Sequence, residues 1–284
     1  EINTKMKFGI ITSWENESAF ETVKQLGLDG MEYTVNHNID SKKFLEDVPE
    51  IKRRLEKYGL SALSTGRWGM KRVDDDGKIL PEALEHDKNV ISGASQLGCP
   101  VFNCGCNYAK NRTLAENYEI ATDYFSKLID FAADKNVKIA IYNCEWENFV
   151  ISPEQWRVVL PSLPALGIKY DPSHCTERVK GYGSYLSEMV EFADRFYHFH
   201  VKGSLIIDSV HYDDPPAGMD GINWGAVFDV LYTKNYSGSV CYEPHSRYWT
   251  GSKGRWAIDF SVKYIKPFII PEDYKGDMSS PYSL

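Results

Sequence analysis

Short apolar runs rich in Val, Ile, Phe and Tyr alternate with amphipathic stretches along this chain. The apolar runs predict eight β-strands, at 7–12, 30–35, 61–66, 101–106, 137–143, 167–171, 196–202 and 238–243. The stretches that follow them predict helices over 18–26, 41–58, 81–97, 114–135, 153–161, 182–194, 224–234 and 255–265. A repeated strand–helix unit forms a parallel sheet covered by helices. The fold is therefore either an open doubly wound sheet or a closed barrel.

The number of units and the lack of one motif favour the barrel. Eight units occupy about 260 residues, which is the usual size of a (β/α)8 TIM barrel. The first predicted strand is not followed by the GxGxxG of dinucleotide-binding doubly wound folds. We therefore expect an α/β fold with a single TIM barrel domain over 1–284. The barrel itself should cover about 6–268, and 269–284, which loses all periodicity, should be a C-terminal extension.

Composition argues against two kinds of partner. The net charge is -8 and the chain has no basic block, whereas binding to nucleic acid requires clustered Lys and Arg. No apolar run approaches the roughly 20 residues that span a bilayer, so no membrane partner is expected. The classes of function that remain are an enzyme with a small-molecule substrate and a protein that binds a small molecule.

The six cysteines form no CxxC pair, and most lie inside or at the ends of predicted strands. This pattern is typical of free thiols in a reducing compartment, so we expect a cytoplasmic location. The chain begins at Glu1 and not at Met, so a periplasmic or secreted location stays open.

Three side chains at the ends of predicted strands have the chemistry of metal ligands. Asp171 and Glu243 end two of these strands, and His200 lies near the end of the strand between them. In a TIM barrel the carboxyl ends of the strands meet at one face, which carries the active site. Carboxylate oxygens and imidazole nitrogens bind divalent metals. Together these residues predict a metal site, although Asp171 alone is equally well explained as a cap of a helix or turn.

His198 shares a strand face with His200, because residues two apart in a strand point the same way. It lies deeper in the predicted strand. We expect it to be a core histidine or to support a ligand.

Four segments resemble a known family: 168–174 (IKYDPSH), 198–203 (HFHVKG), 215–224 (PPAGMDGINW) and 242–245 (YEPH). On these motifs the chain, over essentially 6–268, is similar to the sugar phosphate isomerase/epimerase superfamily, which has a xylose-isomerase-like TIM barrel. The resemblance implies that Asp171 and His200 are metal ligands and that His174 faces the substrate. It also implies that Glu243 both binds the metal and acts near the transferred proton.

The chain departs from the family pattern on the fifth strand. Relatives usually carry a Glu in a run such as I-A-I-E-N, whereas residues 139–143 read I-A-I-Y-N, with Tyr142 in the place of the Glu. This puts a two-base epimerase mechanism in doubt. Glu145 is one candidate for a substitute ligand or base, and a loop carboxylate without a role is the other reading. Gly203 also stands where many relatives have an acidic residue.

Further candidates follow from their positions at strand ends. Lys202 is predicted to stabilise negative charge on oxygen, or else to be a solvated lysine at the barrel mouth. The candidate substrate contacts are Trp14, Arg67, Tyr142, Asn143 and His245, with ordinary packing or ion pairing as the competing reading for most of them.

The predicted reaction is proton transfer at a carbon next to a carbonyl of a sugar or keto-sugar, with a divalent Mn, Mg, Co or Zn ion. The ion would stabilise the enediolate, and His174, Glu145 or Glu243 would move the proton. The first alternative is a lyase or hydratase acting on a 3-keto sugar, glycoside or keto-inositol through the same enolate. The second is a sugar-binding barrel without turnover. The AP-endonuclease branch is disfavoured by the negative charge. A homo-oligomer is possible.

Overall fold

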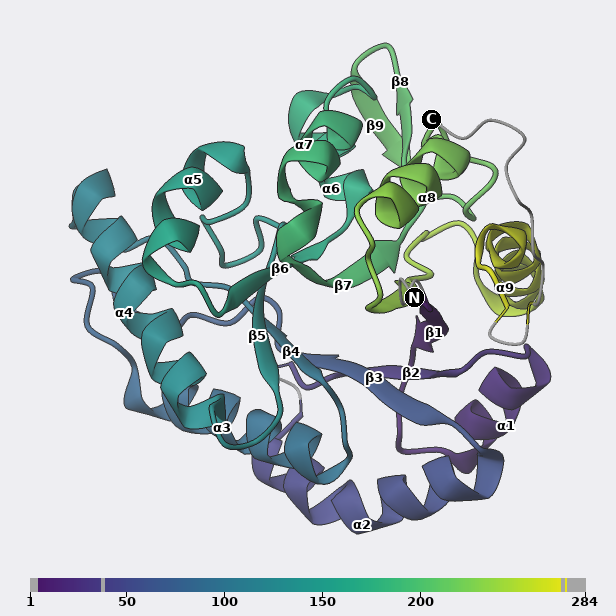
Figure 1. The fold of residues 1–284 in the computed structure, drawn as a ribbon, viewed down its shortest axis with the longest axis horizontal. Coiled ribbons are helices and arrows are strands. Elements are labelled where there is room, and N and C mark those ends of the chain that lie inside the picture. Colours follow the sequence, from purple (N-terminus) through teal and green to yellow (C-terminus); the bar gives the residue numbers. More distant parts are fainter. Residues whose placement is uncertain (1–4, 37–38, 272–273, 275–284) are drawn as a thin grey trace, which may run out of the picture.

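The computed structural model of the protein describes residues 5–36, 39–271 and 274. Parallel strands close into a barrel in the order β1-β10-β7-β6-β5-β4-β3-β2, and helices surround it (Figure 1). The barrel strands are β1 Lys7–Ile11, β2 Gly30–Thr34, β3 Ser61–Gly66, β4 Val101–Cys104, β5 Lys138–Tyr142, β6 Leu166–Tyr170, β7 Phe196–Val201 and β10 Ser239–Tyr242. The predicted (β/α)8 TIM barrel is confirmed, and each predicted strand overlaps one of these.

The predicted helices are also present. The α-helices are α1 Glu17–Gln25, α2 Ser41–Tyr58, α3 Pro81–Gln96, α4 Leu114–Ala132, α5 Pro153–Ser162, α6 Pro172–Val179, α7 Tyr185–Phe192, α8 Trp224–Thr233 and α9 Gly251–Ile265. Two 3-10 turns, Ala193–Arg195 and Lys266–Phe268, follow α7 and α9. The predicted extension 269–284 lies mostly outside the described residues.

Local signals explain several helix ends. Thr113 and Glu116 form a reciprocal capping box at the start of α4, which satisfies backbone N–H groups that have no partner within the helix. Pro153 occupies the first turn of α5, where its missing N–H costs nothing. Gly59 ends α2 in the left-handed region (φ 64°), which a residue without Cβ adopts readily.

The prediction missed α6 and a hairpin formed by β8 (Leu205–Ile207) and β9 (Val210–Asp213). Pro172 predicted only the end of a strand, but it also suits the first position of a helix. In the hairpin turn, Asp208 (φ 50°) and Ser209 (φ 62°) are both left-handed. Such turns usually contain Gly or Asn, so the sequence carried little signal for this one.

Alternation along β6 brings polar groups to the barrel mouth. Tyr170 points outward, where its ring packs against Trp156 of α5 at a centroid distance of 6.1 Å. Successive side chains of a strand point to opposite faces, so Lys169 and Asp171 point inward. Both are buried, and Lys169 lines the mouth cavity described below.

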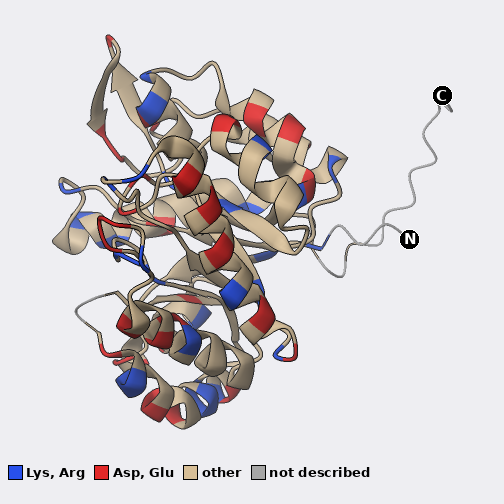
Figure 2. Cartoon of the chain, turned by 90° about the vertical axis from the view of Figure 1, so that its left-hand side faces the viewer, with Lys and Arg blue, Asp and Glu red and all other residues tan. Residues whose placement is uncertain are grey.

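Acidic and basic residues are interspersed along the helices drawn in Figure 2. Opposite charges therefore lie close enough for exposed ion pairs, such as that of Arg157 with Glu191 at 2.6 Å. Of the described helices, none combines the length and apolar character needed to cross a bilayer.

Candidate active site at the barrel mouth

A cavity of about 920 Å³ opens at the carboxyl ends of the strands. Its lining includes Lys169 of β6, His200 of β7 and Glu243, which directly follows β10. This is the end of the barrel at which TIM-barrel enzymes carry their active sites.

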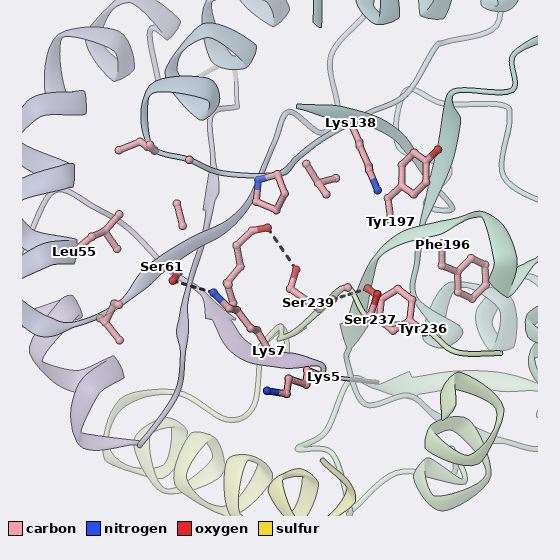
Figure 3. A pocket seen from close by; sticks show the side chains of 18 of the residues that line it. Lys5, Lys7, Leu55, Ser61, Lys138, Phe196, Tyr197, Tyr236, Ser237 and Ser239 are labelled. Atoms are coloured by element: carbon pink, nitrogen blue, oxygen red, sulfur yellow. Dashed lines mark hydrogen bonds between the residues drawn. The ribbon is translucent and has the colours of Figure 1, made fainter. Parts of the chain in front are cut away.

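A second cavity, of about 850 Å³, lies at the opposite end, where the strands begin (Figure 3). Figure 3 shows Lys7 and Lys138, the first residues of β1 and β5, on its walls. Lys7 donates a hydrogen bond from Nζ to Ser61 Oγ at 3.3 Å. The site residues predicted from the sequence are absent from its lining.

Asp171, His200 and Glu243 form the predicted metal-binding group. One ligand atom from each lies within 4.8 Å of the others. Asp171 Oδ1 accepts a hydrogen bond from the Ser173 N–H at 2.9 Å, so this carboxylate does cap α6. Its Oδ2 is buried and has no hydrogen-bond partner among the described residues. Lys169 Nζ lies 3.9 Å from it and His174 Nε2 lies 3.6 Å from it, and neither is within hydrogen-bond distance. Since a buried polar atom without a hydrogen bond is costly, this oxygen fits a directly bound cation.

His200 belongs to a buried hydrogen-bonded chain. Its Nδ1 lies 2.9 Å from Glu243 Oε2, and its Nε2 lies 2.7 Å from Glu32 Oε2. His198 Nε2 lies 2.6 Å from the same Glu32 oxygen, and His198 Nδ1 lies 2.8 Å from Ser239 Oγ. His198 therefore lies behind His200, in keeping with a supporting histidine.

Charges in the cavity oppose the effect of burial on its ionisable groups. Burial would raise the pKa of Glu243, but the hydrogen bond and charge of His200 hold that pKa well below its ordinary value. Burial would lower the pKa of Lys202, but carboxylates including Asp171 raise it. The site therefore keeps ionised carboxylates beside an ammonium group near neutral pH.

Two lysines supply positive charge. Lys202 Nζ donates to Glu177 Oε1 at 3.2 Å. Lys169 Nζ lies 3.9 Å from Asp171 Oδ2 and 5.9 Å from the centre of the Trp68 ring. The sequence analysis did not identify Lys169. Its position inside an apolar strand run was a usable signal, because a lysine is rarely fully buried without a partner.

His174 lies at the edge of the metal-binding group. Its Nε2 is 3.6 Å from Asp171 Oδ2, and its Nδ1 is 3.5 Å from Glu177 Oε2. Glu177, on α6, was also missed, because that helix was not predicted. Glu145 is exposed and lines the cavity from the loop after β5, but it is not part of the metal-binding group.

Trp14 and Arg67 are absent from the lining of the mouth cavity, and their contact with substrate stays a prediction. Trp14 is buried edge-on against Phe44 at a centroid distance of 5.1 Å. Arg67 is buried in an ion pair with Asp87, with 2.9 Å between Nη1 and Oδ1. Local sequence cannot distinguish a buried arginine with a partner from one that faces a cavity.

Tyr142 is buried and absent from the lining of the mouth cavity, and its contact with substrate stays a prediction. Its buried ring stacks on Trp68 at 5.9 Å, and its hydroxyl donates to the Trp146 carbonyl at 3.0 Å. Trp68 and Trp146 line the cavity in its place.

Asn143 and His245 both line the cavity. The side chain of Asn143 is already engaged with the backbone of Asp171, donating to its carbonyl at 2.8 Å and accepting from its N–H at 3.0 Å. Asn143 therefore helps to fix the position of Asp171. His245 Nδ1 lies 2.7 Å from Asp214 Oδ2.

The pair of His245 and Asp214 should make stability depend on pH. The hydrogen bond to Asp214 raises the pKa of His245 above its ordinary value of 6.5. The stabilisation is therefore complete below pH 6.5 and is lost as pH rises through the raised pKa. Because His245 is half-exposed, we expect an effect below about 1 kcal/mol. Urea unfolding between about pH 6 and pH 9 should show this slope, and His245→Gln should reduce it by the contribution of this pair. An unchanged slope in His245→Gln would contradict the assignment.

The family model of the xylose isomerase-like TIM barrel matches residues 20–265. The chain belongs to the xylose isomerase-like TIM barrel family. No curated protein matches this family member by sequence.

Solved structures of the same fold include several sugar enzymes. The 3-keto-D-glucoside 4-epimerase of E. coli is 18% identical, with 93% of this chain and 100% of that chain covered and a TM-score of 0.72. A D-psicose 3-epimerase is 17% identical, with coverage of 93% and 98% and a TM-score of 0.70. The mannonate dehydratase of Streptococcus suis is 15% identical, with coverage of 93% and 94% and a TM-score of 0.69. At these identities the likeness establishes the shared fold.

Proposed function

We propose that this protein is a divalent-metal-dependent sugar epimerase or isomerase that moves a proton next to a carbonyl. The observation that carries the proposal is the group formed by Asp171, His200 and Glu243 at the mouth cavity. These residues come from three neighbouring positions of the barrel, and their ligand atoms lie within 4.8 Å of one another. The buried Asp171 Oδ2, which has no hydrogen-bond partner among the described side chains, supports a bound cation.

A divalent ion at these residues supplies Lewis-acid polarisation of a substrate carbonyl. The chain's own residues supply the rest of the chemistry. Lys169 presents a buried ammonium to the cavity and favours negative charge on a substrate oxygen. His174, 3.6 Å from Asp171 Oδ2, is one candidate to accept the proton, and Glu243, which follows β10, is the other. Trp68 and Trp146 offer apolar surface to a sugar ring.

The named activities of the similar structures support a sugar substrate. They include a 3-keto-D-glucoside 4-epimerase and a D-psicose 3-epimerase. A cytoplasmic location remains a prediction, which the six free cysteines support. A homo-oligomer also remains a prediction.

Metal analysis combined with isotope exchange tests the proposal. The protein is loaded with Mn²⁺, Mg²⁺, Co²⁺ or Zn²⁺ and incubated in D₂O with a panel of ketoses and 3-keto-glycosides. Epimerisation should introduce deuterium at the carbon next to the carbonyl without changing the composition of the sugar. If no metal binds at saturating concentration, the proposal fails.

A lyase or dehydratase is the second candidate, and Tyr142 in the place of a fifth-strand glutamate favours it. Elimination needs only one base and one acid, and a mannonate dehydratase shares the fold. In the same assay, elimination would change the mass of the product by that of the leaving group. Metal and sugar binding without either product would indicate a non-catalytic sugar-binding barrel.

Lys169→Met should separate metal binding from turnover. Removing a positive charge 3.9 Å from Asp171 Oδ2 should tighten the binding of a divalent metal. Turnover should fall by roughly 10²- to 10³-fold, because a donor aimed at developing charge is lost. Calorimetry with Mn²⁺ and kcat on the best substrate measure the two effects. Lys127→Met, at an exposed lysine paired with Asp123, is the control. An unchanged kcat in Lys169→Met would contradict the assigned role.

A further inference from the structure

We propose that Glu32 is a positioning residue that holds the imidazole of His200 so that Nδ1 faces Asp171 and Glu243. The inference rests on the proposed function, because it assigns how one ligand of that metal site is oriented. Glu32 does not line the mouth cavity, so it acts through His200 and not on the substrate.

The contact crosses the interior of the barrel. Glu32 lies on β2 and His200 on β7, and these strands are not neighbours in the sheet. Both side chains are fully or almost fully buried. A distance of 2.7 Å between Glu32 Oε2 and His200 Nε2 across a packed interior leaves the ring little freedom to rotate.

The hydrogen-bond chemistry fixes which nitrogen is presented to the metal site. Glu32 Oε2 lies within 2.7 Å of the Nε2 atoms of both His200 and His198. An ionised carboxylate only accepts hydrogen bonds, so both Nε2 atoms carry a hydrogen. His200 Nδ1 is therefore the nitrogen that faces Glu243 Oε2, at 2.9 Å.

His198 and Ser239 support Glu32 from behind. Ser239 Oγ lies 2.8 Å from His198 Nδ1, which is consistent with a hydroxyl donating to a nitrogen whose ring carries its hydrogen on Nε2. Ser239 is the first residue of β10 and lines the cavity at the amino ends of the strands, where Figure 3 labels it. The series of hydrogen bonds that begins at Ser239 and ends at Glu243 thus crosses the barrel core from one end to the other.

A buried carboxylate behind a metal-binding histidine orients the ring and strengthens it as a ligand, and its loss typically lowers metal affinity by about 10- to 100-fold. Glu32→Gln keeps the shape of the side chain but replaces one acceptor with an amide donor. Both histidines bond the same Glu32 oxygen, so the amide oxygen of Gln can still accept from them. The loss of the negative charge weakens both hydrogen bonds, and with them the hold on the His200 ring.

Nitrogen NMR of ¹⁵N-histidine-labelled wild-type protein tests the inference directly. Two-bond proton–nitrogen correlations distinguish ring nitrogens that carry hydrogen, a lone pair or a metal. We expect His200 to carry hydrogen on Nε2 in the metal-free protein and to bind Zn²⁺, the probe, through Nδ1. A lone pair on Nε2, or zinc bound there, would overturn the proposal. This measurement needs no substitution, so it does not depend on whether a variant folds.

Calorimetric titration with Zn²⁺ tests the energetic consequence. Glu32→Gln, with an unchanged circular dichroism spectrum, should bind Zn²⁺ about 10- to 100-fold more weakly than wild type. Glu188→Gln removes another buried carboxylate, one bonded to Tyr170 at 2.9 Å, and should bind Zn²⁺ as wild type does. A folded Glu32→Gln protein with wild-type affinity would rule out the positioning role. If wild-type protein binds none of Zn²⁺, Mn²⁺, Mg²⁺ and Co²⁺, the proposed function fails. The presence or absence of a hydrogen on His200 Nε2 in the metal-free protein still decides whether Glu32 positions the ring.

Discussion

Asp171→Asn is expected to abolish divalent-metal binding at the mouth and to lower turnover by roughly 10³-fold or more. The amide keeps the size of the side chain, and its oxygen can still accept the Ser173 N–H that caps α6. The substitution removes the negative charge, and with it the buried Oδ2 that has no hydrogen-bond partner among the described residues. Since a hard cation requires a charged oxygen ligand here, the loss should fall on metal binding and not on folding.

Calorimetry with Mn²⁺, turnover on the best substrate and thermal unfolding should be measured together for Asp171→Asn. Asp40→Asn is a matched control, because Asp40 caps α2 in the same way, by accepting the N–H two residues later at 2.9 Å. The control should keep metal binding and activity. Retained metal affinity in Asp171→Asn would remove Asp171 from the site.

Asp87→Ala is expected to cause the largest loss of stability. Asp87 is fully buried and pairs with two buried arginines, Arg67 at 2.9 Å and Arg72 at 3.2 Å. It also accepts a hydrogen bond from the Tyr124 hydroxyl at 2.7 Å. Removing one partner of a buried ion pair typically costs about 3–5 kcal/mol, because an uncompensated charge remains in the core.

Urea unfolding at neutral pH measures this loss. Asp123→Ala is the control, since it breaks an exposed ion pair with Lys127 on one helix face, and such pairs contribute about 0.3–0.5 kcal/mol. Asp87→Asn can still accept the hydrogen bond from Tyr124, so its loss of unfolding free energy should lie between those of Asp87→Ala and Asp123→Ala. Equal midpoints for Asp87→Ala and Asp123→Ala would show that the arginines find other partners.

The strand–helix alternation was enough to predict the barrel, because hydrophobic periodicity is a local property of the chain. It missed the β8–β9 hairpin, where Asp208 and Ser209 adopt left-handed conformations without Gly or Asn. It also missed α6, because Pro172 is compatible both with the end of a strand and with the start of a helix.

The alternation of strands and helices and the positions of the strand ends were enough to identify the barrel and the three candidate ligands Asp171, His200 and Glu243. A residue at the end of a barrel strand lies near the mouth because the carboxyl ends of all strands meet there, although Arg67 shows that it need not face the cavity. The convergence of the three ligands within 4.8 Å then follows from closure of the sheet.

Which polar groups contact one another across the barrel could be learned only from the three-dimensional fold. Glu32 lies within hydrogen-bond distance of His200 although the two residues are 168 positions apart in the sequence. Arg67 forms an ion pair with Asp87, whereas the adjacent Trp68 lines the cavity. The physical reason is that a buried charge must find a partner in space. The choice of partner depends on packing between elements that are distant in the chain, and periodicity along a single strand does not contain it.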